Sequence, residues 1–273
     1  MRRSKASVAG EVGFAALAVV FAFPLYLLVA MSLKTPQQAA RSPFSAPTTP
    51  RLANYTEAWS QASLGVALLN SVVVTAVSVC LLVLLGALAS YVLARRLSRL
   101  SNAVYLLFLV GIMVPFQMAI IPLYALIQDL GLMGTWTSVT VFYTGLLMPF
   151  TVFLYTGFLR AVPRDYEEAA LTDGASPRQA FFRVVFPLLR PVTGTVAILD
   201  SLYVWNDFFA PLLFLGGSGQ ETLPVAIYAF VGQYVSQWNL IFAGLVIAML
   251  PVLVIYFLLQ RHMIKGFASG IRG

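Results

Sequence analysis

The chain has 273 residues, of which 60% are hydrophobic and only 10% are charged, and its mean hydropathy is +0.86. A soluble domain carries about 25% charged residues, so the composition excludes an ordinary soluble enzyme and indicates a protein that crosses a membrane several times. The net charge of +7 comes from basic residues scattered over short flanking segments. That distribution is typical of membrane topology signals and argues against a nucleic-acid surface.

The sequence predicts an all-α polytopic membrane protein with six transmembrane helices, because a helix needs about 20 apolar residues to cross the hydrocarbon. We expect one membrane domain over residues 1–273. Prolines interrupt the third, fourth and sixth spans, and bundled membrane helices tolerate such breaks. The six spans cover residues 12–33, 64–94, 103–127, 137–159, 191–215 and 240–259.

The orientation follows from the lysines and arginines, which are enriched on the cytoplasmic side of a membrane. With the N-terminus inside, the inner segments hold 14 of the 17 basic residues, and the outer segments hold only Lys34, Arg41 and Arg51. We therefore expect both termini to be cytoplasmic. The charged loop at residues 160–190 and the tail at residues 260–273 are then cytoplasmic as well.

The charged loop lies between apolar spans, and its sequence predicts two short helices. Asp165 and Glu168 have the spacing of a capping box, and acidic residues favour the first turn of a helix. Gly174 supplies a left-handed residue where this helix stops. A second helix begins at Ser176 with Pro177 in its first position and is expected to end before Pro187.

One face of the first helix carries Tyr166, Ala169, Ala170 and Asp173, which recur at helical spacing. The alanines keep this face thin, so it could enter a groove on another protein. The alternative is an amphipathic pair of helices on the membrane surface, which would favour basic residues on the polar face. The acidic character of the first helix favours the docking interpretation.

The loop also carries Glu168-Ala169-Ala170, three residues, Gly174, nine residues, Val184 and then Phe186-Pro187. This motif resembles the EAA loop of ATP-binding-cassette importer permeases. The family pattern is EAA, three residues, Gly, nine residues, Ile, one residue and Leu-Pro. Val184 replaces the isoleucine and Phe186 replaces the leucine, while the spacing is intact. The matching residues are Glu168, Ala169, Ala170, Gly174, Val184, Phe186 and Pro187, and Ala175 extends the DGA version common in sugar importers.

Four further stretches are similar to the carbohydrate permeases of the maltose type. They are SLKTPQQ at residues 32–38, WNDFFAPLLFL at 205–215, TLPVAIYAF at 222–230 and QRHMIKGFASGIRG at 260–273. The resemblance is to the shorter, six-span MalG-like subunit and covers most of the chain. It implies the MetI-like permease fold of a type I importer with a cytoplasmic coupling helix.

The resemblance also implies a function and a set of partners. The chain would be the permease subunit of a sugar importer in a bacterial or archaeal plasma membrane, surrounded by lipid. Its partners would be a MalF-like permease, a MalK-like ATPase dimer and an extracytoplasmic sugar-binding protein. The residues implied in ATPase coupling are Tyr166, Glu168, Ala169, Ala170, Asp173, Gly174, Ala175 and Pro187, with Glu168 as the charged anchor and Gly174 at the turn.

Catalysis by this chain is not expected. No GxxxxGK[ST] motif occurs, so ATP and magnesium are expected on the partner ATPase, with no cofactor here. One cysteine and one histidine provide neither a metal site nor the nucleophile and base of an intramembrane enzyme.

Polar residues inside the spans are candidates for a transport path, because they are costly there. Gln117, Trp205, Asn206 and Asp207 would line the path of a sugar, whose hydroxyls bond amides and carboxylates. The alternative for the polar groups is hydrogen bonding between helices. Asp200 and Asp207 lie seven residues apart on one helical face, which leaves a secondary transporter with a proton relay as the alternative function.

Overall fold

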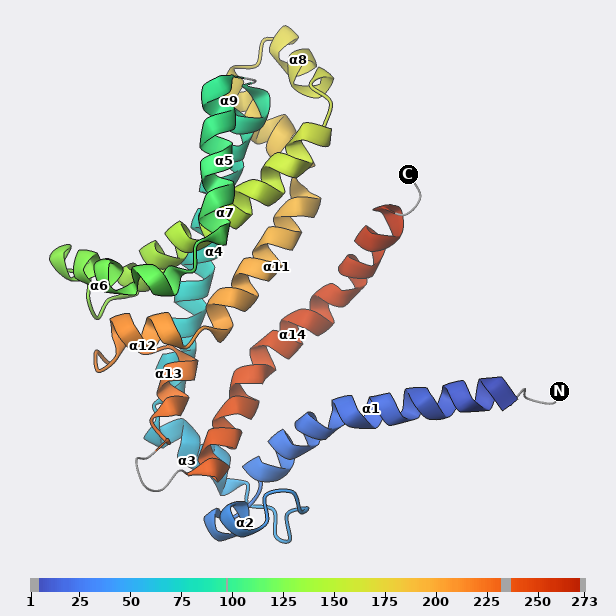
Figure 1. Ribbon diagram of the computed structural model, residues 1–273, viewed down its shortest axis with the longest axis vertical. Helices are drawn as coiled ribbons and strands as arrows, with labels where there is room; N and C mark the ends of the chain where they lie inside the picture. The colour runs from blue at the N-terminus through green and yellow to red at the C-terminus, as the bar shows by residue number, and fades with distance from the viewer. Residues whose placement is uncertain (1–4, 97, 232–236, 271–273) are drawn as a thin grey trace. The chain divides into compact units, whose positions relative to one another are not determined.

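The computed structural model describes residues 5–96, 98–231 and 237–270, and every regular element in them is a helix (Figure 1). This confirms the all-α prediction. The elements are α1 (Lys5–Ser32), α2 (Pro36–Arg41), α3 (Ala53–Gln61), α4 (Leu64–Arg95), α5 (Arg99–Met113), the 3-10 helix η1 (Phe116–Ala119), α6 (Ile120–Asp129), α7 (Trp136–Ala161), α8 (Asp165–Thr172), α9 (Pro177–Ala180), the π-helix η2 (Phe181–Val185), α10 (Phe186–Leu188), α11 (Arg190–Asn206), α12 (Phe209–Leu215), α13 (Leu223–Tyr228) and α14 (Trp238–Gly270).

The chain forms two compact units. Unit 1 comprises Met1–Leu68 and Leu223–Gly273, and unit 2 comprises Leu69–Thr222. In unit 1, α14 packs against α1, α2, α3 and α13. The apolar side chains of α1 are mostly exposed, as Phe14 at 77% illustrates, so this helix has the surface of one that meets lipid or another apolar helix.

A buried polar cluster in unit 1, here called the Lys34 node, consists of Ser32, Lys34, Asn54 and Asn239. The Lys34 ammonium donates hydrogen bonds of 2.7 Å to the carbonyl oxygens of Ser42 and Pro43. The Asn54 amide donates to the carbonyl oxygens of Ser32 and Lys34, both at 2.8 Å, and accepts from the Asn239 amide at 2.9 Å. The node holds the end of α1 against the starts of α3 and α14.

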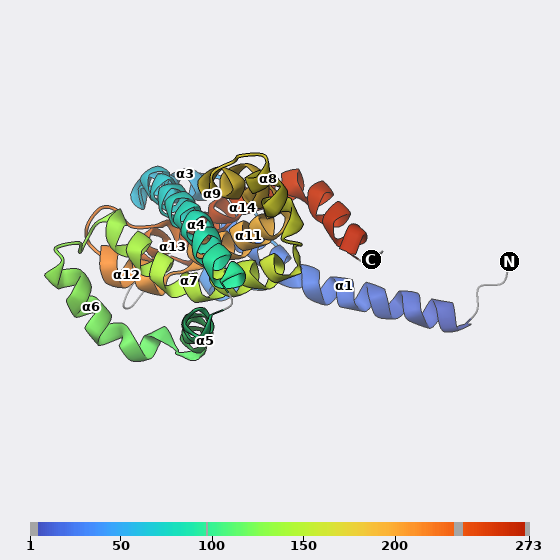
Figure 2. The same ribbon diagram turned by 90° about the horizontal axis from the view of Figure 1, so that it is seen from above.

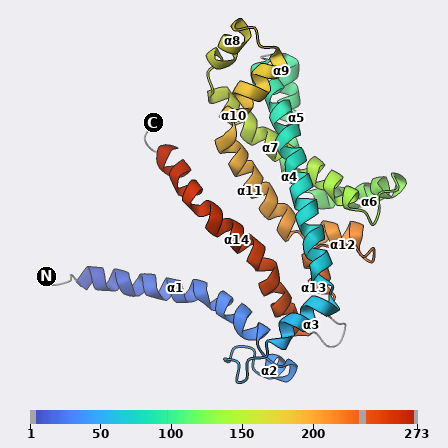
Figure 3. The ribbon, with the colours of Figure 1, turned by 180° about the vertical axis from the view of Figure 1, so that it is seen from behind.

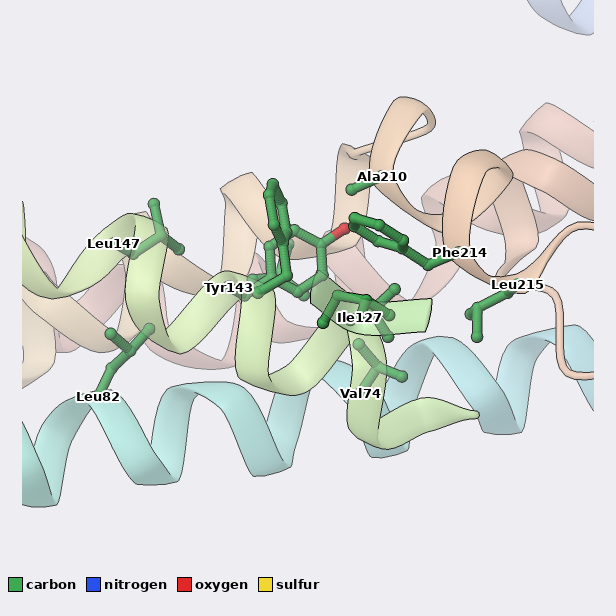
Figure 4. Close-up of a cluster of buried hydrophobic side chains, with 11 residues drawn as sticks. Val74, Leu82, Ile127, Tyr143, Leu147, Ala210, Phe214 and Leu215 are labelled. Atoms are coloured by element: carbon green, nitrogen blue, oxygen red, sulfur yellow. The ribbon is translucent and has the colours of Figure 1, made fainter. Parts of the chain in front are cut away.

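Unit 2 is built around α4, α7 and the pair α11–α12, and its buried cluster joins all of them (Figure 4). Tyr143 of α7 is fully buried between Leu82 of α4 and Phe214 of α12 in this cluster. Gly86 of α4 lies so close to α7 that an added Cβ would stand 2.4 Å from Cγ2 of Thr151. A glycine is therefore required for the close approach of these two helices.

The predicted spans fall on three kinds of segment: long single helices, bent or broken pairs of helices, and part of one longer helix. The first, second and fourth are the apolar helices Gly13–Ser32 within α1, α4 and α7, each long enough to cross a membrane. The third is bent by 92° between α5 and the segment Phe116–Asp129 (Figure 2). The sixth lies within α14, whose shorter apolar stretch is Trp238–Val254.

The fifth predicted span, residues 191–215, is not one helix. It consists of α11 and α12, separated by Asp207 and Phe208. At its other end, α11 meets the helical segment Pro177–Leu188 at a bend of 72° (Figure 3). The predicted tail continues as helix to Gly270, and residues 271–273 lie outside the described residues.

Candidate functional site

The charged loop folds into two short helices joined by a tight turn, as the sequence predicts. The helix α8 begins at Asp165, and Gly174 follows it with a φ of +88°. The Ala175 amide donates to the Ala170 carbonyl at 3.0 Å, which closes the turn. Ser176 caps α9 through a reciprocal pair of hydrogen bonds with Gln179, at 2.8 and 3.3 Å.

Two local predictions for this loop were wrong. Asp165 does not cap α8, because Arg164 is the N-cap residue and no side chain bonds to the free amides there. The second helix does not end before Pro187 but continues to Leu188. The π-helix η2 precedes Pro187, and the proline takes a place in the first turn of α10, where its missing amide costs little.

Most of the residues implied in ATPase coupling lie together on α8 and the turn. The Tyr166 side chain is 55% exposed, and Glu168, Ala169 and Asp173 are exposed as well. Ala170 and Ala175 are partly buried. Pro187 lies apart from this group, in α10. The exposed residues form an acidic surface that also carries the Tyr166 ring and the small side chain of Ala169.

Sequence reasoning missed the neighbour of Glu168. Glu167 is only 7% exposed, and its carboxylate is 2.5 Å from Nε of Arg95 at the end of α4. The Arg95 guanidinium also donates to the carbonyl oxygens of Leu159 and Val162 at the end of α7, at 3.0 and 3.2 Å. These four residues, here called the Arg95 node, join α8 to α4 and α7. The helix periodicity of the loop could have placed Glu167 on the face opposite Ala169. It could not have identified Arg95 as the partner of Glu167.

A second candidate site is a pocket of about 440 Å³ in unit 2, where the bend before η1 faces the break between α11 and α12. It brings together three of the predicted path residues, Gln117, Asn206 and Asp207, while Trp205 is not part of its lining. The remaining lining residues are Phe116, Leu202, Tyr203 and Phe209. Aromatic rings beside amide and carboxylate groups suit a ligand that has both apolar faces and hydroxyl groups.

Asp207 also determines the shape of this pocket. Its carboxylate accepts hydrogen bonds from the Tyr143 hydroxyl at 2.8 Å and from the amides of Phe209 and Ala210 at 3.1 and 3.3 Å. The amides at the start of α12 are thereby satisfied where the span is broken. Asp200 lies deeper in unit 2 and accepts a hydrogen bond of 3.0 Å from the Thr151 hydroxyl.

The site contains no recognisable centre for metal chemistry. Across residues 5–96, 98–231 and 237–270, no group of three or more His, Cys, Asp or Glu side chains is placed to hold a metal ion. The two candidate sites are the exposed acidic face of α8 and the polar–aromatic pocket of unit 2.

Comparisons with known proteins agree on one kind of protein. Residues 83–269 match the family described as the binding-protein-dependent transport system inner membrane component. Over 248 residues the chain is 38% identical to the melibiose/raffinose/stachyose import permease protein MelC of Bacillus subtilis (strain 168), with 90% of each chain covered. Over 254 residues it is 35% identical to the probable starch degradation products transport system permease protein AmyC of Thermoanaerobacterium thermosulfurigenes, with 93% of this chain and 92% of the relative covered.

The fold has a counterpart among solved structures. A chain in the crystal structure of a bacterial ABC transporter involved in the import of the acidic polysaccharide alginate superposes with a TM-score of 0.81. The match covers 96% of this chain and 99% of the other, at 18% sequence identity. At that identity the likeness concerns the fold alone.

Proposed function

Because this chain belongs to the family of binding-protein-dependent transport system inner membrane components, we propose that it is the MalG-like permease subunit of a sugar importer. It is a non-catalytic subunit of an ATP-driven importer, and the ATPase lies on a partner chain. The observation that carries the proposal is the exposed α8 with its glycine turn, which has the residues and spacing of a coupling helix.

The proposed partners are a MalF-like second permease, a MalK-like ATPase dimer that binds ATP and magnesium, and an extracytoplasmic sugar-binding protein. The acidic face of α8 enters a cleft of the ATPase, with Glu168 as the charged anchor. Closure of the ATPase dimer on ATP moves α8, and the permease pair then switches between inward-open and outward-open states. Such a switch requires two states of the bundle that the partner stabilises differently.

The proposed cargo is a neutral oligosaccharide. Relatives that cover nine-tenths of the chain carry the names of systems for raffinose-type sugars and starch degradation products. The pocket supports this class of cargo, because Gln117 and Asn206 offer amide groups to hydroxyls while Phe116 and Tyr203 offer apolar rings. We assign Gln117, Asn206 and Asp207 to the translocation path. Trp205 adjoins it and is half-buried.

The proposed topology keeps six spans and places both termini in the cytoplasm of the cell. The bent segment Arg99–Asp129 counts as the third span, and α11 with α12 counts as the fifth, while Pro177–Leu188 belongs to the cytoplasmic loop at residues 160–190. The excess of basic residues in the inner segments supports this orientation. It puts α8 on the side where ATP is available.

The test is sugar uptake by the assembled system in proteoliposomes. Glu168→Arg reverses the anchor's charge, and Gly174→Trp adds a bulky side chain at a φ of +88°; each should abolish ATP-driven uptake. Asp129→Arg, the same charge reversal on an exposed residue of α6, is the matched control and should transport normally. Unchanged uptake in both coupling variants would disprove the proposal. Uptake by the chain alone, driven by a pH gradient, would instead support the secondary transporter with Asp200 and Asp207.

A further inference from the structure

Two adjacent glutamates in α8 have opposite environments. Glu168 is exposed, whereas Glu167 is 7% exposed and pairs with Arg95. Neighbouring residues on a helix point about 100° apart, so one of them can contact a partner protein while the other is held within the chain. The family motif includes Glu168 but assigns no role to Glu167.

Three groups that carry full or partial negative charge bind Arg95. Its guanidinium contacts the Glu167 carboxylate of α8 and the carbonyl oxygens of Leu159 and Val162, at the end of α7. The C-terminus of a helix carries a partial negative charge, so both sets of contacts favour the cation. A planar guanidinium presents five donors in a fixed fork, which suits acceptors that are held on two different helices.

A second contact between the same two segments runs from the start of α8 back to the end of α4. The Arg164 side chain, just before α8, donates a hydrogen bond of 3.0 Å to the Arg95 carbonyl oxygen. Each chain segment therefore binds the other through an arginine. The ends of α4 and α7 and the start of α8 are joined at the same end of unit 2 (Figure 1).

The helix α7 continues from this node to the pocket. Its end accepts hydrogen bonds from Arg95, and further along its length Tyr143 donates to Asp207, which lines the pocket. Between these points, α7 packs closely on α4 through Thr151 and Gly86. A movement of α8 is thereby connected to the pocket through one continuous helix.

We infer that Glu167 and Arg95 are positioning residues of the coupling device: they fasten α8 to α4 and α7, so that movement of α8 is passed to the helices that shape the pocket. Glu168 remains free for the ATPase. The role in coupling depends on the proposed function, but the fastening of α8 does not. Removing the ion pair leaves α8 able to bind the ATPase and unable to move the bundle efficiently.

The first experiment measures the fastening itself, using two neighbouring substitutions as a matched pair. Spin labels replace Leu171 of α8 and Phe153 of α7, both exposed, in a Cys80→Ser background of the assembled complex. The distance distribution between the labels should be narrow in the parent and in Glu168→Gln, and clearly broader in Glu167→Gln and Arg95→Gln. Equal widths in Glu167→Gln and Glu168→Gln would overturn the inference.

The second experiment measures coupling in proteoliposomes that contain all partners. In Glu167→Gln the ATPase should still co-purify, and the number of sugar molecules moved per ATP should fall about tenfold. In Glu168→Gln the ATPase should be retained less well. An unchanged ratio in Glu167→Gln would overturn the coupling role, and so would loss of the ATPase equal to that in Glu168→Gln.

Failure of the fastening inference and failure of the proposed function give different results. If the parent complex shows no ATP-driven uptake, the proposed function is wrong, and the label distances still decide whether α8 is fastened. If Arg95→Gln does not assemble, as judged by size-exclusion chromatography, Glu167→Gln alone decides the outcome, since it preserves the size and shape of the side chain.

Discussion

Lys34 in unit 1 and Arg95 in unit 2 are both enclosed cations, and their partners differ. Lys34 is completely buried and bonds to the carbonyl oxygens of Ser42 and Pro43. Arg95 bonds to two carbonyl oxygens and also pairs with the Glu167 carboxylate. A cation bound by uncharged groups alone can be replaced without leaving a charge behind, whereas removing one member of a buried ion pair leaves the other uncompensated. Loss of one partner should therefore cost more stability at the Arg95 node than at the Lys34 node.

The largest loss of stability is expected for Arg95→Met. This change leaves the Glu167 carboxylate without its counter-charge and the carbonyls of Leu159 and Val162 without a donor, so the free energy of unfolding should fall by about 3–5 kcal/mol. The measurement is denaturant unfolding in detergent. Arg95→Met combined with Glu167→Gln should recover part of the loss. A double variant as unstable as the single one would show that the ion pair is not the cause.

The next effect is expected for Asn54→Leu in the Lys34 node. The substitution frees the carbonyl oxygens of Ser32 and Lys34 and removes the acceptor of Asn239. Unpaired buried polar groups cost about 1–3 kcal/mol, and we expect a loss near the upper end of that range. The unfolding midpoint measures it, with Gln61→Leu on the exposed end of α3 as the control. A loss no greater than that of the control would contradict the assignment.

Lys34→Met should be milder than Arg95→Met, and this difference tests the comparison most directly. Methionine fills a similar volume, and the desolvation cost of the charge disappears, while the carbonyls of Ser42 and Pro43 lose their donor. We expect a net loss of about 1–2 kcal/mol. Both variants are measured under the same unfolding conditions. A larger loss at Lys34 than at Arg95 would reverse the interpretation of the two nodes.

The smallest expected effect is a pH dependence of the stability that Lys34 contributes. Burial lowers the pKa of Lys34 below its ordinary 10.5, so between the lowered value and 10.5 the folded chain binds fewer protons at this residue than the unfolded chain. Stability contributed by Lys34 should therefore rise as pH rises through that window. The difference in unfolding midpoint between the parent and Lys34→Met should grow toward alkaline pH. A difference that stays constant with pH would mean that the pKa of Lys34 is the same in the folded and unfolded chain.

Several features of the fold followed from local patterns. The apolar runs predicted the long helices α1, α4 and α7, and the pair Asp173–Gly174 predicted the turn after α8. Ser176 and Pro177 predicted the start of α9. Each of these depends on one contiguous stretch of the chain, so the sequence carries the whole signal.

The sequence was insufficient at two places, one inside the charged loop and one at the break between α11 and α12. The end of the second loop helix was misplaced at Pro187, because η2 shifts the hydrogen-bond register before the proline. Asp207 looked like a path residue, and the structure shows in addition that its carboxylate holds the start of α12 and the Tyr143 hydroxyl. The hydrogen bond with Tyr143 joins residues 64 positions apart, which no local pattern reveals.

The sequence by itself determined the membrane character of this protein, its helical class and the coupling motif, because hydropathy, helix caps and motif spacing are local properties. Only the tertiary structure decided which of two adjacent glutamates is exposed, because that depends on the placement of Arg95 beside the end of α7 and the start of α8. The same holds for the pocket, which exists because a bend after α5 and a break after α11 come together in space. Contacts between distant segments depend on how the helices pack, and no single stretch of the chain predicts that packing.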